Sequence, residues 1–206
     1  MVRLVKPVLF VAALLPAAWL VYALFTDRLG VNPAETLQLE TGIWALRFLL
    51  ATLAVTPIRR ITGWHRIIQY RRMLGLFAFV YATLHLATYV VLDRLFELSG
   101  IWEDVVKRPF ITAGMAAFVL MVPLALTSTK GWIRRLGRRW QLLHRLVYLS
   151  AAAACLHFLW KVKVVIGEPV YYAAILAALL VFRVLWHFRH SAYRLRSPSA
   201  APRTPS

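Results

Sequence analysis

Residues 138–160, RRWQLLHRLVYLSAAAACLHFLW, decide which class of protein this chain belongs to. From Leu142 onward the segment is apolar, and it is long enough to cross the roughly 30 Å hydrocarbon layer of a bilayer at about 1.5 Å per helical residue. Two histidines, His144 and His157, lie within it. Because polar groups are costly inside a membrane, such histidines are candidates for a functional site.

The whole chain has the composition of a membrane protein. Of its 206 residues 61% are hydrophobic and 16% are charged, and the mean hydropathy is +0.65. A soluble domain is closer to a quarter charged, and a disordered chain combines high net charge with low hydrophobicity, so both classes are excluded. The net charge of +17 would suit a nucleic-acid-binding protein, but the apolar content does not. The single cysteine, Cys155, excludes an internal disulfide and a metal site made only of cysteines.

Six apolar runs are long enough to span a bilayer, and they predict an all-α, six-helix transmembrane bundle. The second run is the weakest, because Arg47 interrupts it and Pro57 closes it. We expect the spans at residues 8–26, 42–57, 74–92, 110–127, 142–160 and 170–188. They form one membrane domain over residues 1–190, and residues 191–206 are expected to be a disordered cytoplasmic tail.

Basic and acidic residues separate between alternate connections of this arrangement. Sixteen of the 25 Lys and Arg residues fall at the N-terminus, in the second and fourth connections and in the C-terminal tail, whereas all eight acidic residues fall in the other connections. Because Lys and Arg are retained on the cytoplasmic side, both termini are predicted to be cytoplasmic. The alternative for the first run is a cleaved signal peptide, since Arg3 and Lys6 precede it.

Two of the six histidines are predicted to lie at one depth. His85 lies 11 residues after the start of the third span, and His157 lies 15 residues after the start of the fifth, which runs in the same direction. Two neutral imidazoles on neighbouring helices can ligate a haem iron from both sides. His144 lies 13 residues before His157, roughly 20 Å along a helix, which suits a second redox centre near the cytoplasmic face.

Other interpretations of these residues stay open. Thirteen residues leave His144 and His157 about 140° apart around an ideal helix, so either the fifth span is irregular or the two histidines serve differently placed cofactors. A membrane histidine can also simply hydrogen-bond a neighbouring helix. Arg47 is expected at about the depth of His85, where it could bind a haem propionate or extend toward the interface.

Two sequence motifs carry a resemblance to a known family. One is the W-x-x-x-H-R-L-x-Y element from Trp140 to Tyr148, followed by His157, and the other is RRMLGL at residues 71–76, which leads to His85. With these motifs the chain resembles the haem-binding membrane subunits of bacterial periplasmic methionine-sulfoxide reductase systems, within the ferric-reductase-like transmembrane superfamily.

The resemblance implies a six-span protein of the bacterial inner membrane with one or two b-type haems, ligated by His85, His157 and His144. Flavin mononucleotide is also associated with that family. The wider superfamily commonly has two histidines on each of two helices, but here Arg71 lies 14 residues before His85. The inner site could therefore use His144 with Arg71 or His187, hold a five-coordinate haem, or hold a flavin instead.

The same resemblance implies a function in electron transfer. Electrons would enter on the cytoplasmic side from a flavin reductase or a quinol, and leave to a periplasmic molybdopterin-containing subunit that reduces methionine sulfoxide. The sequence itself offers no nucleophile and no acid–base pair, so we expect no catalytic residues and no enzyme activity of its own. The alternatives are a small transporter or proton relay, which would need a carboxylate within a span, and a non-redox anchor subunit.

Overall fold

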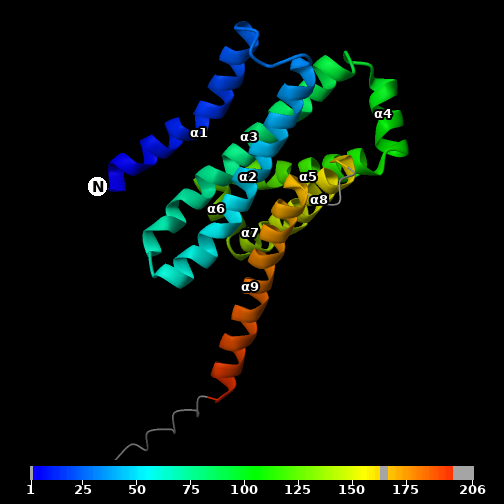
Figure 1. The fold of residues 1–206 in the computed structure, drawn as a ribbon. Coiled ribbons are helices and arrows are strands. Elements are labelled where there is room, and N and C mark those ends of the chain that lie inside the picture. Colours follow the sequence, from blue (N-terminus) through cyan, green and yellow to red (C-terminus); the bar gives the residue numbers. More distant parts are fainter. Residues whose placement is uncertain (1, 163–166, 197–206) are drawn as a thin grey trace, which may run out of the picture.

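The computed structural model describes residues 2–162 and 167–196, and in these ranges the chain is helical without any strand (Figure 1). These residues form nine α-helices, a short 3-10 helix η1 (His65–Tyr70) and one turn of π-helix η2 (Tyr89–Asp93). The α-helices are α1 (Val2–Phe25), α2 (Pro33–Thr62), α3 (Arg71–Thr88), α4 (Leu98–Lys107), α5 (Pro109–Leu126), α6 (Lys130–Leu136), α7 (Arg138–Leu143), α8 (Leu146–Val162) and α9 (Glu168–Arg196).

Six helical segments of the described chain are long and apolar enough to cross a membrane, which confirms the predicted number of spans. The fifth is built from α7 and α8 together, and the third from η1, α3 and η2. The six segments are Val5–Phe25, Pro33–Thr62, His65–Asp93, Pro109–Leu126, Arg138–Val162 and Glu168–Arg189.

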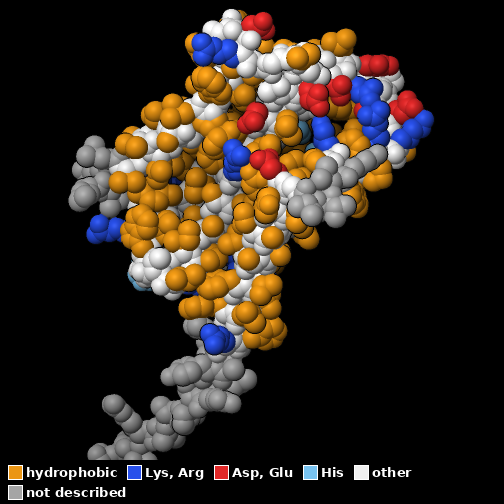
Figure 2. Space-filling view, in the orientation of Figure 1, with side chains coloured by type: hydrophobic (Ala, Val, Ile, Leu, Met, Phe, Trp, Pro, Cys, Tyr) orange, Lys and Arg blue, Asp and Glu red, His pale blue; other side chains and the backbone are white. Residues whose placement is uncertain are grey.

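Four helices form the centre of the bundle as two pairs. Helix α2 packs along α3, and α5 packs along α8, while α9 lies against α8 and α2 (Figure 1). The most buried side chains lie in these central helices, among them Leu53, Tyr81 and Ser150. Much of the outer surface remains apolar, as expected of side chains that face lipid (Figure 2).

Helix α2 is longer than the span predicted at 42–57. Its N-terminus is capped by Asn32, whose side chain accepts the backbone N–H of Glu35, and Pro33 follows at the first helical position. Its C-terminus is closed by Gly63 in the left-handed conformation. The expectation that Pro57 ends this span was wrong, because Pro57 lies inside the helix.

A side chain from another helix compensates for Pro57. Proline has no N–H, so the carbonyl of Leu53, four residues earlier, has no helical donor. The Arg183 guanidinium of α9 donates to that carbonyl at 2.7 Å through Nη2, and through Nη1 it donates to the Tyr148 hydroxyl at 2.6 Å. Helix α2 therefore continues past its proline because α9 supplies the missing hydrogen bond.

The first helix is joined to the bundle in a similar way. The buried Tyr81 hydroxyl donates to the carbonyl of Ala13 at 2.8 Å and accepts the N–H of Ala17 at 3.0 Å, next to Pro16. An inserted side chain of this kind is a usual companion of a proline within a helix.

The connection between the third and fourth spans carries a charged cluster around Asp104. This carboxylate, whose side chain is 6% exposed, accepts hydrogen bonds from the Tyr89 hydroxyl at 2.7 Å and from Arg94, and Arg108 Nε lies 3.1 Å from it. Burial raises the pKa of Asp104, but the bonds from Tyr89 and Arg94 and the positive charge of Arg108 outweigh it, so its pKa lies below the ordinary value.

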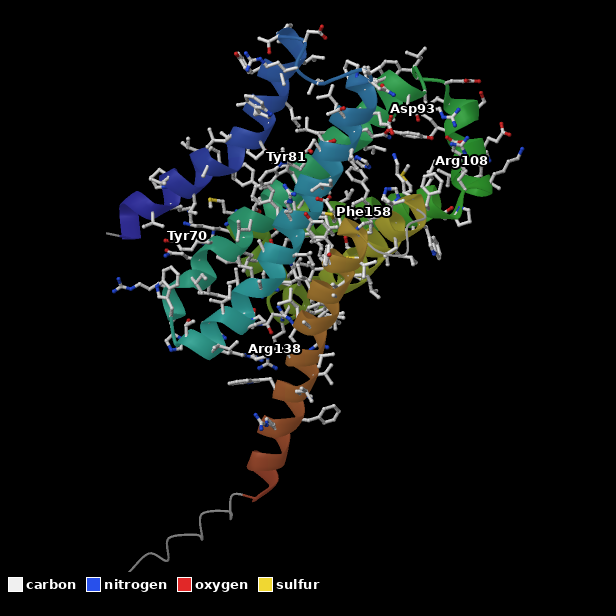
Figure 3. All side chains as sticks on the ribbon, in the orientation of Figure 1. Tyr70, Tyr81, Asp93, Arg108, Arg138 and Phe158 are labelled. Carbon is white, nitrogen blue, oxygen red and sulfur yellow. The ribbon has the colours of Figure 1, made fainter. Side chains whose placement is uncertain are left out.

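The two ends of the bundle differ in charge. Asp93 and Arg108 mark the end near α4, and Arg138 marks the opposite end (Figure 3). On the face drawn in Figure 2 the acidic side chains gather toward the α4 end. Helix α9 continues to Arg196, so residues 191–196 of the expected tail are helical, and residues 197–206 lie outside the described part of the chain.

Candidate functional site

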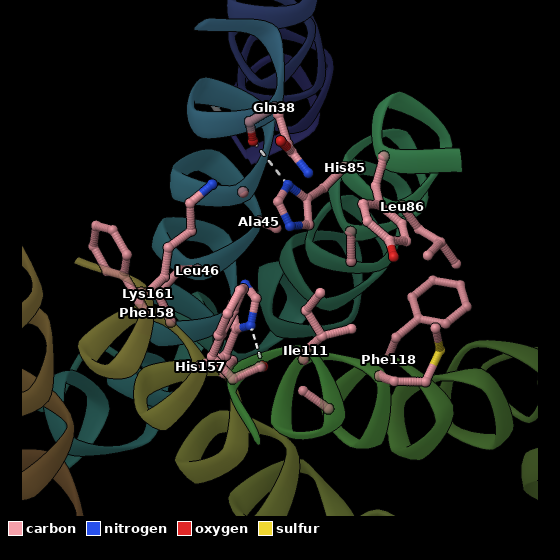
Figure 4. A pocket seen from close by; sticks show the side chains of 18 of the residues that line it. Gln38, Ala45, Leu46, His85, Leu86, Ile111, Phe118, His157, Phe158 and Lys161 are labelled. Atoms are coloured by element: carbon pink, nitrogen blue, oxygen red, sulfur yellow. Dashed lines mark hydrogen bonds between the residues drawn. The ribbon is translucent and has the colours of Figure 1, made fainter. Parts of the chain in front are cut away.

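A cavity of about 390 Å³ lies between the two helix pairs, with walls from α2, α3, α5 and α8 (Figure 4). Its volume is within the range of pockets that hold small molecules and cofactors. Most of its lining is apolar, and it includes Leu46, Leu49, Ile111, Phe118 and Phe158. Two histidines, His85 and His157, are the polar groups that face each other across it.

The structure brings His85 and His157 together as the depth comparison expected. Their ring centres lie 5.9 Å apart with an interplanar angle of 76°. In each ring one nitrogen points toward the other ring and one toward the helix that packs beside it (Figure 4). The two rings come from α3 and α8, which belong to different helix pairs.

The outward nitrogen of each ring is bound to the backbone. His85 Nδ1 lies 2.8 Å from the carbonyl oxygen of Gln38, and His157 Nδ1 lies 2.6 Å from that of Phe110. A carbonyl can only accept, so each Nδ1 carries a proton and donates it. In a neutral imidazole this leaves Nε2 unprotonated, and metal-binding histidines are commonly oriented by such a second hydrogen bond.

The 5.9 Å between the ring centres of His85 and His157 fits a metal ion held by both rings. The midpoint between the ring centres is about 3 Å from each, and because an imidazole nitrogen lies roughly 1 Å from its ring centre, about 2 Å is left for each metal–nitrogen bond. Two such bonds on opposite sides, with apolar walls around them, suit a planar metal cofactor of the haem type better than a bare ion. In the described residues no group of three or more His, Cys, Asp or Glu side chains could hold a metal by itself.

Charged side chains line the cavity at the end nearest α4. They are Asp93 at the end of η2, Arg108 before α5 and Lys161 near the end of α8. Arg47, a predicted cofactor-binding residue, is not among the lining residues. Its Nε donates to the Tyr172 hydroxyl at 2.8 Å, and its guanidinium lies over the Trp44 ring, 4.7 Å from the ring centre.

His144 and Arg71 lie away from this cavity and close to each other. The ring of His144 stacks on Trp140 with 3.9 Å between centres, and its Nε2 is 3.2 Å from the Thr127 hydroxyl. Arg71 is within electrostatic reach of His144. The helix is interrupted between α7 and α8 at His144 and Arg145, so the fifth span is locally irregular, and His144 also lies apart from the cavity that His157 lines.

Several residues of the site were missed by the sequence analysis. Gly42 and Gly114 lie against the rings of His85 and His157, and Lys161 and Arg108 line the cavity as its cations. The glycines could have been found from their spacing, because each lies 43 residues before its histidine. Lys161 and Arg108 had no such signal, since in the sequence they fall in the connections between predicted spans, where charged residues are common.

Comparison with known proteins identifies the family of the chain. A family model described as the ferric reductase like transmembrane component matches residues 41–155, which include His85 and His144 and end two residues before His157. The chain belongs to the ferric-reductase-like transmembrane family. This confirms the resemblance seen in the two motifs.

Relatives within this family are similar over nearly the whole chain. A protein of Herminiimonas arsenicoxydans named protein-methionine-sulfoxide reductase heme-binding subunit MsrQ is 51% identical over 89% of this chain and 85% of its own length. Proteins of the same name from Brucella ovis and Brucella canis are 51% identical over 95% of this chain and 86% of their own length. No solved structure matches the chain.

Proposed function

We propose that the chain is the haem-binding electron-transfer subunit of a methionine-sulfoxide reductase system, with a b-type haem held between His85 and His157. The observation that carries the proposal is the pair of facing imidazoles, each with Nδ1 bound to a backbone carbonyl and Nε2 directed into an apolar cavity. The names of the MsrQ relatives agree with it. A haem held by both neutral imidazoles would supply electron transfer rather than binding of oxygen.

A bound haem would supply one-electron redox chemistry, and the residues of the chain determine its surroundings. His85 and His157 hold the group from two sides. Leu46, Ile111 and Phe118 exclude water from it. At one end of the cavity, beside Asp93, Lys161 and Arg108 are the cations with which carboxylate groups of a cofactor would pair.

We infer the orientation in the membrane from the distribution of charge along the chain, and the direction of electron transfer from the resemblance to the family. Most Lys and Arg residues lie at the end of the bundle opposite the cavity, so by the retention of positive charge this end is cytoplasmic and both termini lie there, in the bacterial inner membrane. Electrons enter at this end from a flavin reductase or a quinol. They leave near α4 to a periplasmic molybdopterin-containing subunit that reduces methionine sulfoxide.

His144 and Arg71 belong to a separate inner site in this proposal. They could serve a second haem or a flavin mononucleotide near the cytoplasmic end. Because His144 lies outside the cavity, His144→Ala is expected to leave the haem between His85 and His157 in place.

The absorption spectrum of the purified protein tests the proposal. Wild-type protein is expected to show a reducible Soret band of six-coordinate haem, which His85→Ala and His157→Ala abolish or convert to a five-coordinate form, while His144→Ala keeps it. A wild-type protein without any reducible Soret band would contradict the proposal and leave the transporter and anchor alternatives. Loss of all haem in His144→Ala would contradict the assignment of two separate sites.

A further inference from the structure

The two histidines of the cavity are held by one arrangement that occurs twice in the chain. Each imidazole Nδ1 bonds the carbonyl of the residue 47 positions earlier, and each ring lies against a glycine 43 positions earlier. Helices α2 and α3 supply one copy, with Gln38, Gly42 and His85, and the second copy, from α5 and α8, follows 72 residues later. The carbonyl and the glycine are one helical turn apart, so each ring lies across that turn.

The glycines leave space that any larger residue would fill. A β-carbon added at Gly42 would lie 2.9 Å from His85 Nδ1 and 3.0 Å from its Cε1. One added at Gly114 would lie 2.7 Å from His157 Nδ1 and 3.0 Å from its Cε1. Carbon atoms do not approach ring atoms this closely without displacement, so an alanine at either position moves the imidazole away from its carbonyl.

The backbone itself does not require glycine at these positions. Both residues lie inside helices, and neither is among the glycines with positive φ. Glycine is unfavourable inside a helix compared with alanine, so its presence twice at the same place calls for a reason in the packing. The imidazole ring is the group that occupies the space in both copies.

We propose that Gly42 and Gly114 are positioning residues that set the orientation of His85 and His157 toward the cofactor. The inference deepens the proposed function and rests on it. With glycine present, the ring keeps its Nδ1–carbonyl bond and directs Nε2 into the cavity. With alanine, the ring turns, the bond weakens and Nε2 no longer faces the opposite imidazole.

The chain offers a matched control in Gly75 of α3. A β-carbon there would lie 3.6 Å from Thr52 Cγ2, an ordinary van der Waals contact at the same α2–α3 interface. Gly75→Ala therefore adds a methyl group between the same two helices without touching either histidine. Any effect of Gly42→Ala that Gly75→Ala lacks belongs to the imidazole.

The first test compares haem binding and electron paramagnetic resonance of the ferric forms. Gly42→Ala and Gly114→Ala are each expected to bind haem roughly 10- to 100-fold more weakly, as is usual when a partner that orients a metal ligand is lost. The haem that remains should show a high-spin signal and a shifted reduction potential. Gly75→Ala should match wild type in all three measurements.

A second test measures thermal stability rather than haem binding. Because the added methyl meets the imidazole, Gly42→Ala should lower the unfolding midpoint of the wild-type protein but not that of His85→Ala, where the ring is absent. Gly114→Ala should remain destabilising in His85→Ala and become neutral in His157→Ala. Because each glycine variant is compared in both histidine backgrounds, the inference can be tested even if one single variant folds poorly.

The outcomes separate this inference from the proposed function. Low-spin haem in wild type, with unchanged spectra in both glycine variants, would overturn the positioning role while the proposed function stands. Equal destabilisation by Gly42→Ala with and without His85 would also overturn it, because the glycine would then serve helix packing alone. A wild-type protein without haem would overturn the proposed function. The stability test would then show by itself whether each glycine makes room for its imidazole.

Discussion

Each imidazole in the cavity has one nitrogen bound to the backbone and one directed at the opposite ring. The carbonyls of Gln38 and Phe110 decide this, since an acceptor forces the proton onto Nδ1. A histidine held in this way loses little freedom when it ligates a metal. The orientation of the ligands is therefore prepared by the fold before any cofactor binds.

Asp104 gives a prediction at the residue scale. Its pKa lies below the ordinary value, so the ionised carboxylate stabilises the folded state above the unfolded pKa, and this stabilisation is lost as the pH falls through the lower, folded pKa. Asp104→Asn should thus lower the thermal unfolding midpoint at neutral pH, and the difference from wild type should shrink below about pH 4. Thermal unfolding of both proteins in detergent from about pH 3 to 7 measures this difference in midpoint.

Glu103 is the control for this prediction. It pairs with Lys107 on the same helix, but both side chains are largely exposed, at 59% and 70%. Exposed pairs of this kind contribute little, so Glu103→Gln should change the midpoint much less than Asp104→Asn. A difference between wild type and Asp104→Asn that stays constant down to about pH 3 would show that the cluster is not held by the ionised carboxylate.

At the scale of single helices, prolines and hydrogen bonds from neighbouring helices occur together. Pro57 leaves the Leu53 carbonyl without its helical donor, and Arg183 of α9 supplies one. Pro16 lies beside the point where the Tyr81 hydroxyl joins α1. In a membrane no water can satisfy such groups, so α2 keeps its length because α9 provides the partner that Pro57 removes.

A double-mutant cycle tests the pairing of Pro57 with Arg183. Arg183→Met leaves the Leu53 carbonyl unsatisfied and should destabilise the protein by about 1–3 kcal/mol. Pro57→Ala restores an N–H for that carbonyl, so Arg183→Met should cost less in the Pro57→Ala background. Unfolding in mixed detergent micelles measures the four variants.

Tyr148→Phe is the control for this cycle, because it removes the other partner of Arg183 and leaves Leu53 untouched. Tyr148→Phe should lower the free energy of unfolding by the same amount with and without Pro57. If Arg183→Met were equally costly in both backgrounds, the guanidinium would not be compensating for the proline.

At the scale of the molecule, the separation of charges predicts the orientation in the membrane. With Cys155 replaced by Ser, single cysteines introduced by Ser99→Cys and Gly131→Cys lie at opposite ends of the bundle. If both termini are cytoplasmic, a membrane-impermeant thiol reagent should label Ser99→Cys in intact spheroplasts, and Gly131→Cys only after lysis. The reverse pattern would invert the direction proposed for electron transfer.

Much of the architecture could be predicted from the sequence because it depends on local composition. The number of spans follows from apolar length, and most boundaries lie within about four residues of the predicted ones. The exceptions are the second span, which begins nine residues earlier and ends five later, and the third, which begins nine residues earlier. The C-terminal end of the second span was placed too early, since the effect of Pro57 depends on Arg183, 126 residues away. The break in the fifth span could be suspected from the angle between His144 and His157, but only the structure locates it.

The sequence by itself determined the class of the protein and its six spans, and it predicted that His85 and His157 lie at one depth, because length, hydropathy and depth are properties of single segments. Only the tertiary structure decided which groups surround those rings. Gln38 and Gly42 act through their contact with a ring 47 and 43 residues away, and Lys161 lines the cavity while Arg47 does not. Such roles depend on how helices pack against one another, and packing is a property of pairs of segments that no single segment contains.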